Sequence, residues 1–153
     1  MRRGRRTRIS PSEPRVPRPA RGKRADQDLI AHAREVQARS YSPYSGLRVG
    51  AAARDVEGRI FTGCNVENAS FGLTLCAERA AVFKAVSEGA SPLVSMAITT
   101  SRGTPVMPCG ACRQVLAELA PRLELIAAGK GGRSRRAFIR DLLPNAFGPA
   151  DLS

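Results

Sequence analysis

The chain has 153 residues, which is long enough for one domain with a hydrophobic core, and no apolar run approaches the length that spans a membrane. Its net charge of +12 is uneven, because residues 1–24 hold ten of the 25 Lys and Arg residues and only one acid, Glu13. The four cysteines include a Cys-x-x-Cys, and no secretory signal is recognisable. This usage favours metal binding in a reducing, cytoplasmic setting over a disulfide-stapled secreted domain.

The basic segment at residues 1–24 is rich in Arg and Pro and poor in apolar side chains. Such a composition buries too little apolar surface to offset its ordering entropy, so we expect a disordered arm ahead of a folded domain at 25–153. The arm has three open interpretations. The first is a solvated tail, or a start of translation further downstream. The second is weak contact with nucleic acid. The third is a transit peptide, although the prolines oppose the amphipathic helix that such a peptide needs.

The first half of the domain is predicted to contain a helix and a β-hairpin. The helix begins at a cap formed by Asp26 or Asp28 and runs to about Ser40, with a mostly apolar face at Leu29, Ile30, Ala33, Val36 and Gln37. A loop at 42–46 leads to strands at 49–54 and 59–64, joined by a turn at 55–58. The polar segment 65–68 that follows is typical of a loop in which Asn side chains cap the backbone.

The second half alternates helices and buried strands. We expect a helix at 76–88, with Phe83 and Val86 among its core residues, and a helix at 109–119, with Val115, Leu116 and Leu119 on one face. Strands are expected at 94–99, 123–128 and 136–139. Only the glycine-rich turn 129–132 joins the last two strands, so they should pair antiparallel, because a parallel pair needs a longer connection. The fold class is therefore α/β, with helices on the faces of a mixed five-stranded sheet.

Three cysteines have the spacing of a metal site. Cys76 and Cys109 each open a predicted helix, where the pKa of a thiol falls, and Cys112 shares a helical face with Cys109. Three thiolates leave a fourth position of a tetrahedral Zn²⁺ open for water, which is the catalytic arrangement. Addition of Cys64 would instead give a closed, structural four-cysteine zinc site.

A carboxylate and two arginines accompany these cysteines. Glu78 follows Cys76 by two residues and can reach a water at the metal, where it would shuttle protons; the alternative is a first-turn Glu that complements the helix dipole. The pattern Cys-x-Glu followed by Pro-Cys-x-x-Cys is a variant of the zinc-deaminase signature. Arg79 and Arg113 are expected to donate hydrogen bonds to the sulfurs and offset their negative charge, although both also fit the helix surface.

From about residue 26 to 152 the chain resembles the small, homotetrameric cytidine deaminases of the cytidine/deoxycytidylate deaminase family. The resemblance is carried by Ser42-Pro43-Tyr44-Ser45, Val49-Gly50-Ala51-Ala52, Gly63-Cys64-Asn65-Val66-Glu67-Asn68-Ala69, Cys76-Ala77-Glu78-Arg79, Pro108-Cys109-Gly110-Ala111-Cys112-Arg113-Gln114, Leu142-Leu143-Pro144 and Phe147-Gly148-Pro149. It implies a three-layer α/β/α fold and the zinc-dependent deamination of cytidine and deoxycytidine in pyrimidine salvage.

The resemblance also implies roles for residues that bind the nucleoside. Asn65 and Glu67 would bind the ribose hydroxyls, and the backbone of Ala77 would read the pyrimidine edge together with Glu78. Phe71 and Phe147 would line the site, with Phe147 contributed by a neighbouring subunit. Leu47 departs from the family, which usually has a Phe packing on the pyrimidine there.

Three other functions stay open. The fold also suits a blasticidin-S-type deaminase, which has a similar Pro-Cys-Gly-x-Cys-Arg-Gln, but Glu67 and Phe147-Gly148-Pro149 favour cytidine. A nucleic-acid cytosine deaminase would agree with the basic arm, but those enzymes tend to have parallel last strands. A zinc-stabilised nucleic-acid-binding module would leave Glu78 without a role.

Overall fold

The structure is a computed structural model that describes residues 22–152, so the arm predicted at 1–24 lies almost wholly outside the described residues. The main elements, in chain order, are α1 (Lys23–Gln37), β1 (Val49–Asp55), β2 (Ile60–Cys64), α2 (Ala77–Ser87), β3 (Leu93–Thr100), α3 (Gly110–Leu119), β4 (Glu124–Ala128), β5 (Ser134–Phe138) and α4 (Ile139–Leu142). Two 3₁₀ turns, at Phe71–Leu73 and Pro149–Leu152, complete the described chain. None of its helices is long and apolar enough to cross a membrane.

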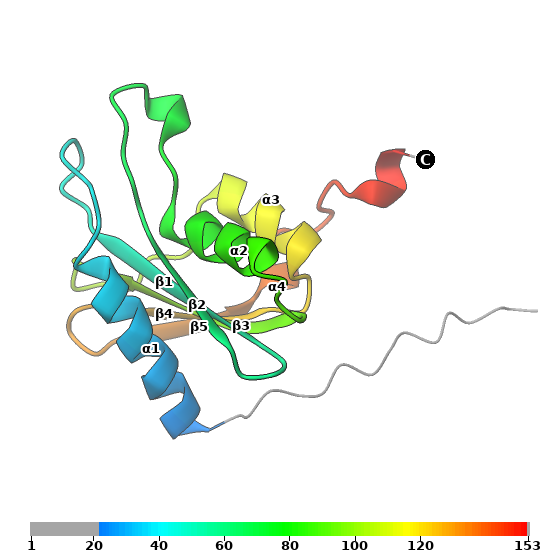
Figure 1. The fold of residues 1–153 in the computed structure, drawn as a ribbon, viewed down its shortest axis with the longest axis horizontal. Coiled ribbons are helices and arrows are strands. Elements are labelled where there is room, and N and C mark those ends of the chain that lie inside the picture. The colour runs from blue at the N-terminus through cyan, green and yellow to red at the C-terminus, as the bar shows by residue number, and fades with distance from the viewer. Residues whose placement is uncertain (1–21, 153) are drawn as a thin grey trace, which may run out of the picture.

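The five strands form one mixed sheet in the order β2-β1-β3-β4-β5. Only β3 and β4 are parallel, with α3 as their crossover, and β4 and β5 pair antiparallel across the short glycine turn as predicted. Helix α1 covers one face of the sheet, and α2 and α3 lie over the other (Figure 1). The predicted three-layer α/β/α architecture is therefore confirmed.

Helix α1 differs from its prediction at its N-terminus. It begins at Lys23, inside the segment assigned to the arm, and neither Asp26 nor Asp28 caps it. Both carboxylates instead face the sheet, where Asp28 pairs with Arg54 at 2.7 Å and Asp26 pairs with Arg136. The sequence could not show these partners, because both arginines lie far along the chain.

Two glycines bring the helices close to the sheet. A Cβ at Gly63 of β2 would collide with the backbone of α2 at Ala81, and a Cβ at Gly50 of β1 would collide with the α1 carbonyl of Ala33. Glycine in a strand is typical of such a close approach of backbones. The contact at Gly63 sets the height of α2 above the sheet, and with it the position of the first residues of α2.

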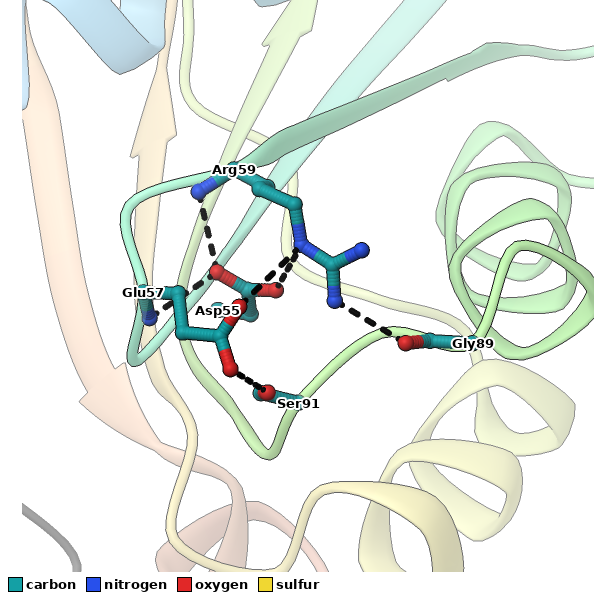
Figure 2. Close-up of polar contacts among 5 residues, drawn as sticks. All are labelled: Asp55, Glu57, Arg59, Gly89 and Ser91. Carbon is teal, nitrogen blue, oxygen red and sulfur yellow. Dashed lines mark hydrogen bonds and ion pairs between the residues drawn. The ribbon is translucent and has the colours of Figure 1, made fainter.

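The tip of the β1–β2 hairpin is fixed by a buried carboxylate (Figure 2). Asp55 is 1% exposed and accepts hydrogen bonds from the backbone amides of Glu57 and Arg59 and from the Arg59 guanidinium at 2.9 Å. Arg59 also donates to the carbonyl of Gly89, and Ser91 donates to Glu57. The network therefore ties the hairpin to the connection between α2 and β3.

Candidate active site

The starts of α2 and α3 bring three cysteines together. Cys76 and Cys109 immediately precede the two helices, both in extended conformation, and Cys112 lies in the first turn of α3 with no exposed surface. The three Sγ atoms lie within 4.8 Å of one another, and those of Cys76 and Cys109 are 3.8 Å apart. The three predicted ligands thus converge on one point.

The donor set suits a zinc ion. A hydrogen bond from Cys112, assisted by Arg79, lowers the pKa of the Cys76 thiol to about 5, whereas that contact and burial raise the pKa of Cys112. Three sulfurs this close can all be thiolates only with a cation among them, because their charges repel. Cys64 is a free thiol in β2 and does not belong to the cluster in the described chain, so the closed four-cysteine site is wrong.

Glu78 lies beside the sulfurs on the first turn of α2. It is only 5% exposed, and the charges of Cys76 and Arg79 both act on its carboxyl. Burial raises the pKa of Glu78 to about 7, and the negative charge at Cys76 acts in the same direction. A buried carboxyl with such a pKa can both accept and release a proton, which a first-turn Glu on the surface would not need to do.

The two arginines have different roles. The Arg79 guanidinium lies 3.6 Å from the Cys76 sulfur and donates to the carbonyl of Thr74 at 3.0 Å, so its predicted contact with the cluster is present. Arg113 instead donates to the carbonyls of Pro108 at 2.8 Å and Leu142 at 3.2 Å. Its predicted contact with a sulfur is therefore wrong, and Arg113 braces the start of α3 against the C-terminal segment.

A cavity of about 350 Å³ lies in the segments that precede α2. It is lined by Tyr44, Ser45, Glu67, Phe71 and Thr74. Glu67 accepts hydrogen bonds from the Ser45 hydroxyl and from the amides of Tyr44 and Ser45, which hold its pKa below the usual range. The ring of Phe71 is 73% exposed and meets that of Tyr44 edge-on at 5.9 Å. Glu67 therefore presents a fixed carboxylate beside an aromatic wall.

Asn65 is buried and holds the neighbouring loop. Its amide nitrogen donates to the carbonyl of Leu47 and its side-chain oxygen accepts from the amide of Val49, both at 2.8 Å. These bonds fix the half-buried Leu47 in place, whereas the expected capping of the 65–68 loop by its own Asn side chains is made by Asn68, whose side-chain oxygen accepts from the amide of Ser70 at 2.8 Å. Any contact of Asn65 with a ribose would add to this supporting role.

The remaining predicted site residues lie on either side of the cluster. Ala77 is fully buried at the start of α2, directly between Cys76 and Glu78. Phe147 is 59% exposed, and its carbonyl accepts a hydrogen bond from Gln114 at 2.7 Å. Three cavity residues were not among the predicted site residues, namely Tyr44, Ser45 and Thr74; the motif Ser42-Pro43-Tyr44-Ser45 was the available signal for the first two.

Comparisons with known proteins agree with this site. Residues 23–127 match the family model described as the cytidine and deoxycytidylate deaminase zinc-binding region. A cytidine deaminase of Halalkalibacterium halodurans is 44% identical over 128 residues, covering 83% of this chain and 97% of the relative. One from Mycobacterium tuberculosis is 48% identical over 124 residues, covering 81% and 90%.

Solved structures of cytidine deaminases are also similar to the chain. The crystal structure of cytidine deaminase from Burkholderia pseudomallei aligns with a TM-score of 0.76 and 44% identity, covering 79% of this chain and 98% of that one. The match to a zinc-binding region and the cluster of Cys76, Cys109 and Cys112 identify Zn²⁺ as the cofactor. The extent of the family match and the identity to these relatives show that the chain belongs to the cytidine and deoxycytidylate deaminase family.

Proposed function

We propose that the protein converts cytidine and deoxycytidine to uridine and deoxyuridine with release of ammonia, in pyrimidine salvage. The observation that carries this proposal is the placement of buried Glu78 beside three converging cysteine sulfurs. A structural zinc site has no use for a neighbouring carboxyl that is protected from water. A hydrolytic deaminase needs one, because protons must move between water, ring and leaving amine.

Glu78 carries the protons of the reaction. A Zn²⁺ ion held by Cys76, Cys109 and Cys112 would supply Lewis-acid activation of a water for attack at carbon C4 of the pyrimidine. Glu78 accepts a proton from that water and delivers it to ring nitrogen N3 as the C4–oxygen bond forms. It then transfers the second water proton to the amino group, the C4–nitrogen bond breaks, and ammonia leaves while the C4 carbonyl forms. The positive guanidinium of Arg79 lies 3.6 Å from the Cys76 sulfur and partly offsets the negative charge of that thiolate.

The cavity in front of α2 supplies the nucleoside contacts. The Glu67 carboxylate, held by three hydrogen bonds, would accept from ribose hydroxyls, and Asn65 would keep the loop in register beside it. Phe71 and Leu47 would contact the base, and the amide of Ala77 would bind its polar edge. Leu47 provides apolar contact without stacking, so we expect weaker base binding than an aromatic side chain would give.

The active unit is proposed to be a homotetramer in the cytoplasm. Phe83 and Val86 on α2 and Leu119 on α3 are 45%, 57% and 43% exposed, although the sequence pattern had placed Phe83 and Val86 in the core. An apolar surface on the α2–α3 layer suits contact with other copies of the chain. Phe147 would then reach a neighbour's site. The free cysteines agree with a reducing compartment.

The test is a zinc-dependent turnover assay. Zinc-loaded protein is mixed with cytidine, and the loss of the cytosine absorbance is followed while ammonia is measured independently. We expect equal amounts of uridine and ammonia, and no activity after chelation. Deamination of blasticidin S or short RNAs without deamination of cytidine would show that the substrate is one of those compounds. A zinc-loaded protein that deaminates none of the three would refute the enzymatic proposal.

A further inference from the structure

A basic cavity lies at the end of the sheet where α1 terminates, apart from the residues assigned to the active site. It has a volume of about 410 Å³ and is lined by Arg34, Gln37, Thr100, Ser101 and Lys130. These residues come from the last turns of α1, the end of β3 and the β4–β5 turn, three segments that Figure 1 shows at the same end of the sheet. The two cations therefore face one space from separate elements.

The backbone of Arg48 holds two of the lining residues in place. Arg48 lines a neighbouring cavity of about 390 Å³. Its amide donates to the Ser101 hydroxyl at 3.2 Å, and its carbonyl accepts from Gln37 at 3.3 Å and from the Ser101 amide at 2.9 Å. Arg48 is thus bonded to two lining residues of the basic cavity. Because the Ser101 hydroxyl accepts from Arg48, its own hydrogen can be donated to a ligand.

These cations have no acidic partners. Within residues 22–152, no carboxylate lies within ion-pair distance of Arg34, Arg48 or Lys130. The other end of α1 is different, since the arginines of the sheet there are paired with Asp26 and Asp28. Arg34 alone would be explained by the dipole at the C-terminal end of its helix. That explanation does not extend to Lys130 on the opposite wall, and like charges around one cavity attract an anion.

We propose that the cavity lined by Arg34, Gln37, Ser101 and Lys130 binds phosphate groups. The unpaired Arg34 and Lys130 supply charge, and the Ser101 hydroxyl and the Gln37 amide supply neutral donors. The phosphate could belong to the backbone of a single-stranded nucleic acid or to a small phosphate anion, and both would use these contacts. Lys and Arg residues that track a backbone give sequence-independent, salt-sensitive binding.

The site would also be adjacent to the nucleoside pocket. Arg48 follows Leu47, whose carbonyl accepts from Asn65, and Ser101 begins the loop that leads to Cys109. The proposal does not depend on deamination, because none of the lining residues belongs to the zinc or nucleoside machinery. Loss of phosphate binding and loss of turnover are therefore separable observations.

The test compares two double variants of the full chain that have equal net charge. Arg34→Gln/Lys130→Gln removes both lining cations, and Lys23→Gln/Lys84→Gln removes two exposed cations elsewhere. Binding of a labelled single-stranded RNA is measured by fluorescence anisotropy across a range of salt concentrations, and cytidine turnover is measured in parallel. Residues 1–22 are identical in every sample, so any RNA binding through this part of the predicted arm is constant.

We expect the cavity variant to bind RNA several-fold more weakly than the control variant, with turnover unchanged in both. The slope of log affinity against log salt should fall by about 1.4, from roughly 0.7 per lost phosphate contact. Equal affinities of the two variants for RNA would exclude the nucleic-acid source. Inorganic phosphate is then titrated into the protein, and the NMR shifts of the Ser101 and Lys130 amides are followed. A saturable shift that is lost in the cavity variant supports a site for a small phosphate anion. If neither RNA nor phosphate distinguishes the variants, the proposal is wrong.

Discussion

At the scale of residues, the three sulfurs of the site have distinct surroundings. Cys112 is fully buried, Cys109 is exposed, and Cys76 lies between them beside the Arg79 guanidinium. The hydrogen bond from Cys112 and the Arg79 guanidinium favour the thiolate form of Cys76. The cluster therefore offers a metal one protected face, formed by α2 and α3, and one open face towards solvent.

Replacement of each cysteine by serine should separate the three ligands from the fourth thiol. A hydroxyl is a much poorer zinc ligand than a thiolate at neutral pH, so Cys76→Ser, Cys109→Ser and Cys112→Ser should each lose the ion. Cys64→Ser is the matched control and should keep one zinc per chain. Native mass spectrometry measures the content directly, and zinc loss from the Cys64 variant would contradict the three-ligand site.

Leu47→Phe should strengthen nucleoside binding. An aromatic ring at this half-buried position can stack on the pyrimidine, and stacking on a base contributes about 1–3 kcal/mol. We expect KM for cytidine to fall at least several-fold while kcat changes little. Leu47→Met provides the control of similar volume without a ring. An unchanged or higher KM in the Phe variant would show that residue 47 does not face the base.

The sequence predicted the residues whose position follows from local helical geometry. Cys76 and Glu78 share one helical turn, as do Cys109 and Cys112, so their spacing alone determines that they can meet a common ion. Arg113 was misplaced because a long side chain takes its direction from tertiary neighbours, here the carbonyls of Pro108 and Leu142. Those carbonyls have no signal in a single sequence.

At the scale of elements, the β1–β2 hairpin depends on Asp55. Burial tends to raise the pKa of this carboxyl, but hydrogen bonds from Arg59 and its charge outweigh burial and hold the pKa below the usual range. A carboxyl with a lowered pKa stabilises the fold above its unfolded-state pKa, and this contribution disappears as the pH falls through the folded-state value. The contribution of the hairpin to the free energy of unfolding should therefore decrease in acid.

Asp55→Asn tests this expectation. The amide keeps the volume but loses the ion pair, so the variant should be less stable at pH 7 by about 2–3 kcal/mol, as for hydrogen bonds to a charged group. Urea unfolding followed at several pH values should show the gap to wild type closing below about pH 4, where Asp in the unfolded chain becomes protonated. Glu57→Gln, whose side chain is 61% exposed, should cost under about 1 kcal/mol. A gap that stays constant down to pH 3 would contradict the role of the Asp55 charge.

The element order and the antiparallel last pair were predictable because they follow from periodicity and from the length of connections. Which face of each helix is buried was less predictable. Val82 and Ala85 of α2 are buried, whereas Phe83 and Val86 are exposed. An isolated sequence does not show which apolar stripe of a helix faces the sheet and which stays on the surface of the chain. Asp26 and Asp28 likewise pair with arginines of the sheet instead of capping α1, so the helix begins earlier than expected.

At the scale of the whole molecule, the exposed apolar side chains of α2 and α3 should be covered in solution. Light scattering of the zinc-loaded protein should give about four times the mass of one chain. Phe83→Asp/Leu119→Asp should shift the mass towards monomer, because charge at an apolar contact is costly to bury, and turnover should fall with it. Gln27→Asp/Ser134→Asp adds the same charge at exposed polar residues of α1 and β5 and is the matched control. A fully active monomer would refute the tetramer.

The central claim is that Glu78 moves protons beside a three-cysteine zinc site, and Glu78→Gln tests it most directly. The amide has the same volume and hydrogen-bonding reach, but it cannot accept and release a proton. The zinc-loaded variant should fold, hold its ion and bind cytidine, while its turnover falls by a factor of roughly 10²–10⁴, as expected for loss of a general acid–base. Zinc content and uridine release should be measured on the same samples of wild type and variant. Near-normal turnover by a zinc-loaded Glu78→Gln protein would contradict the account.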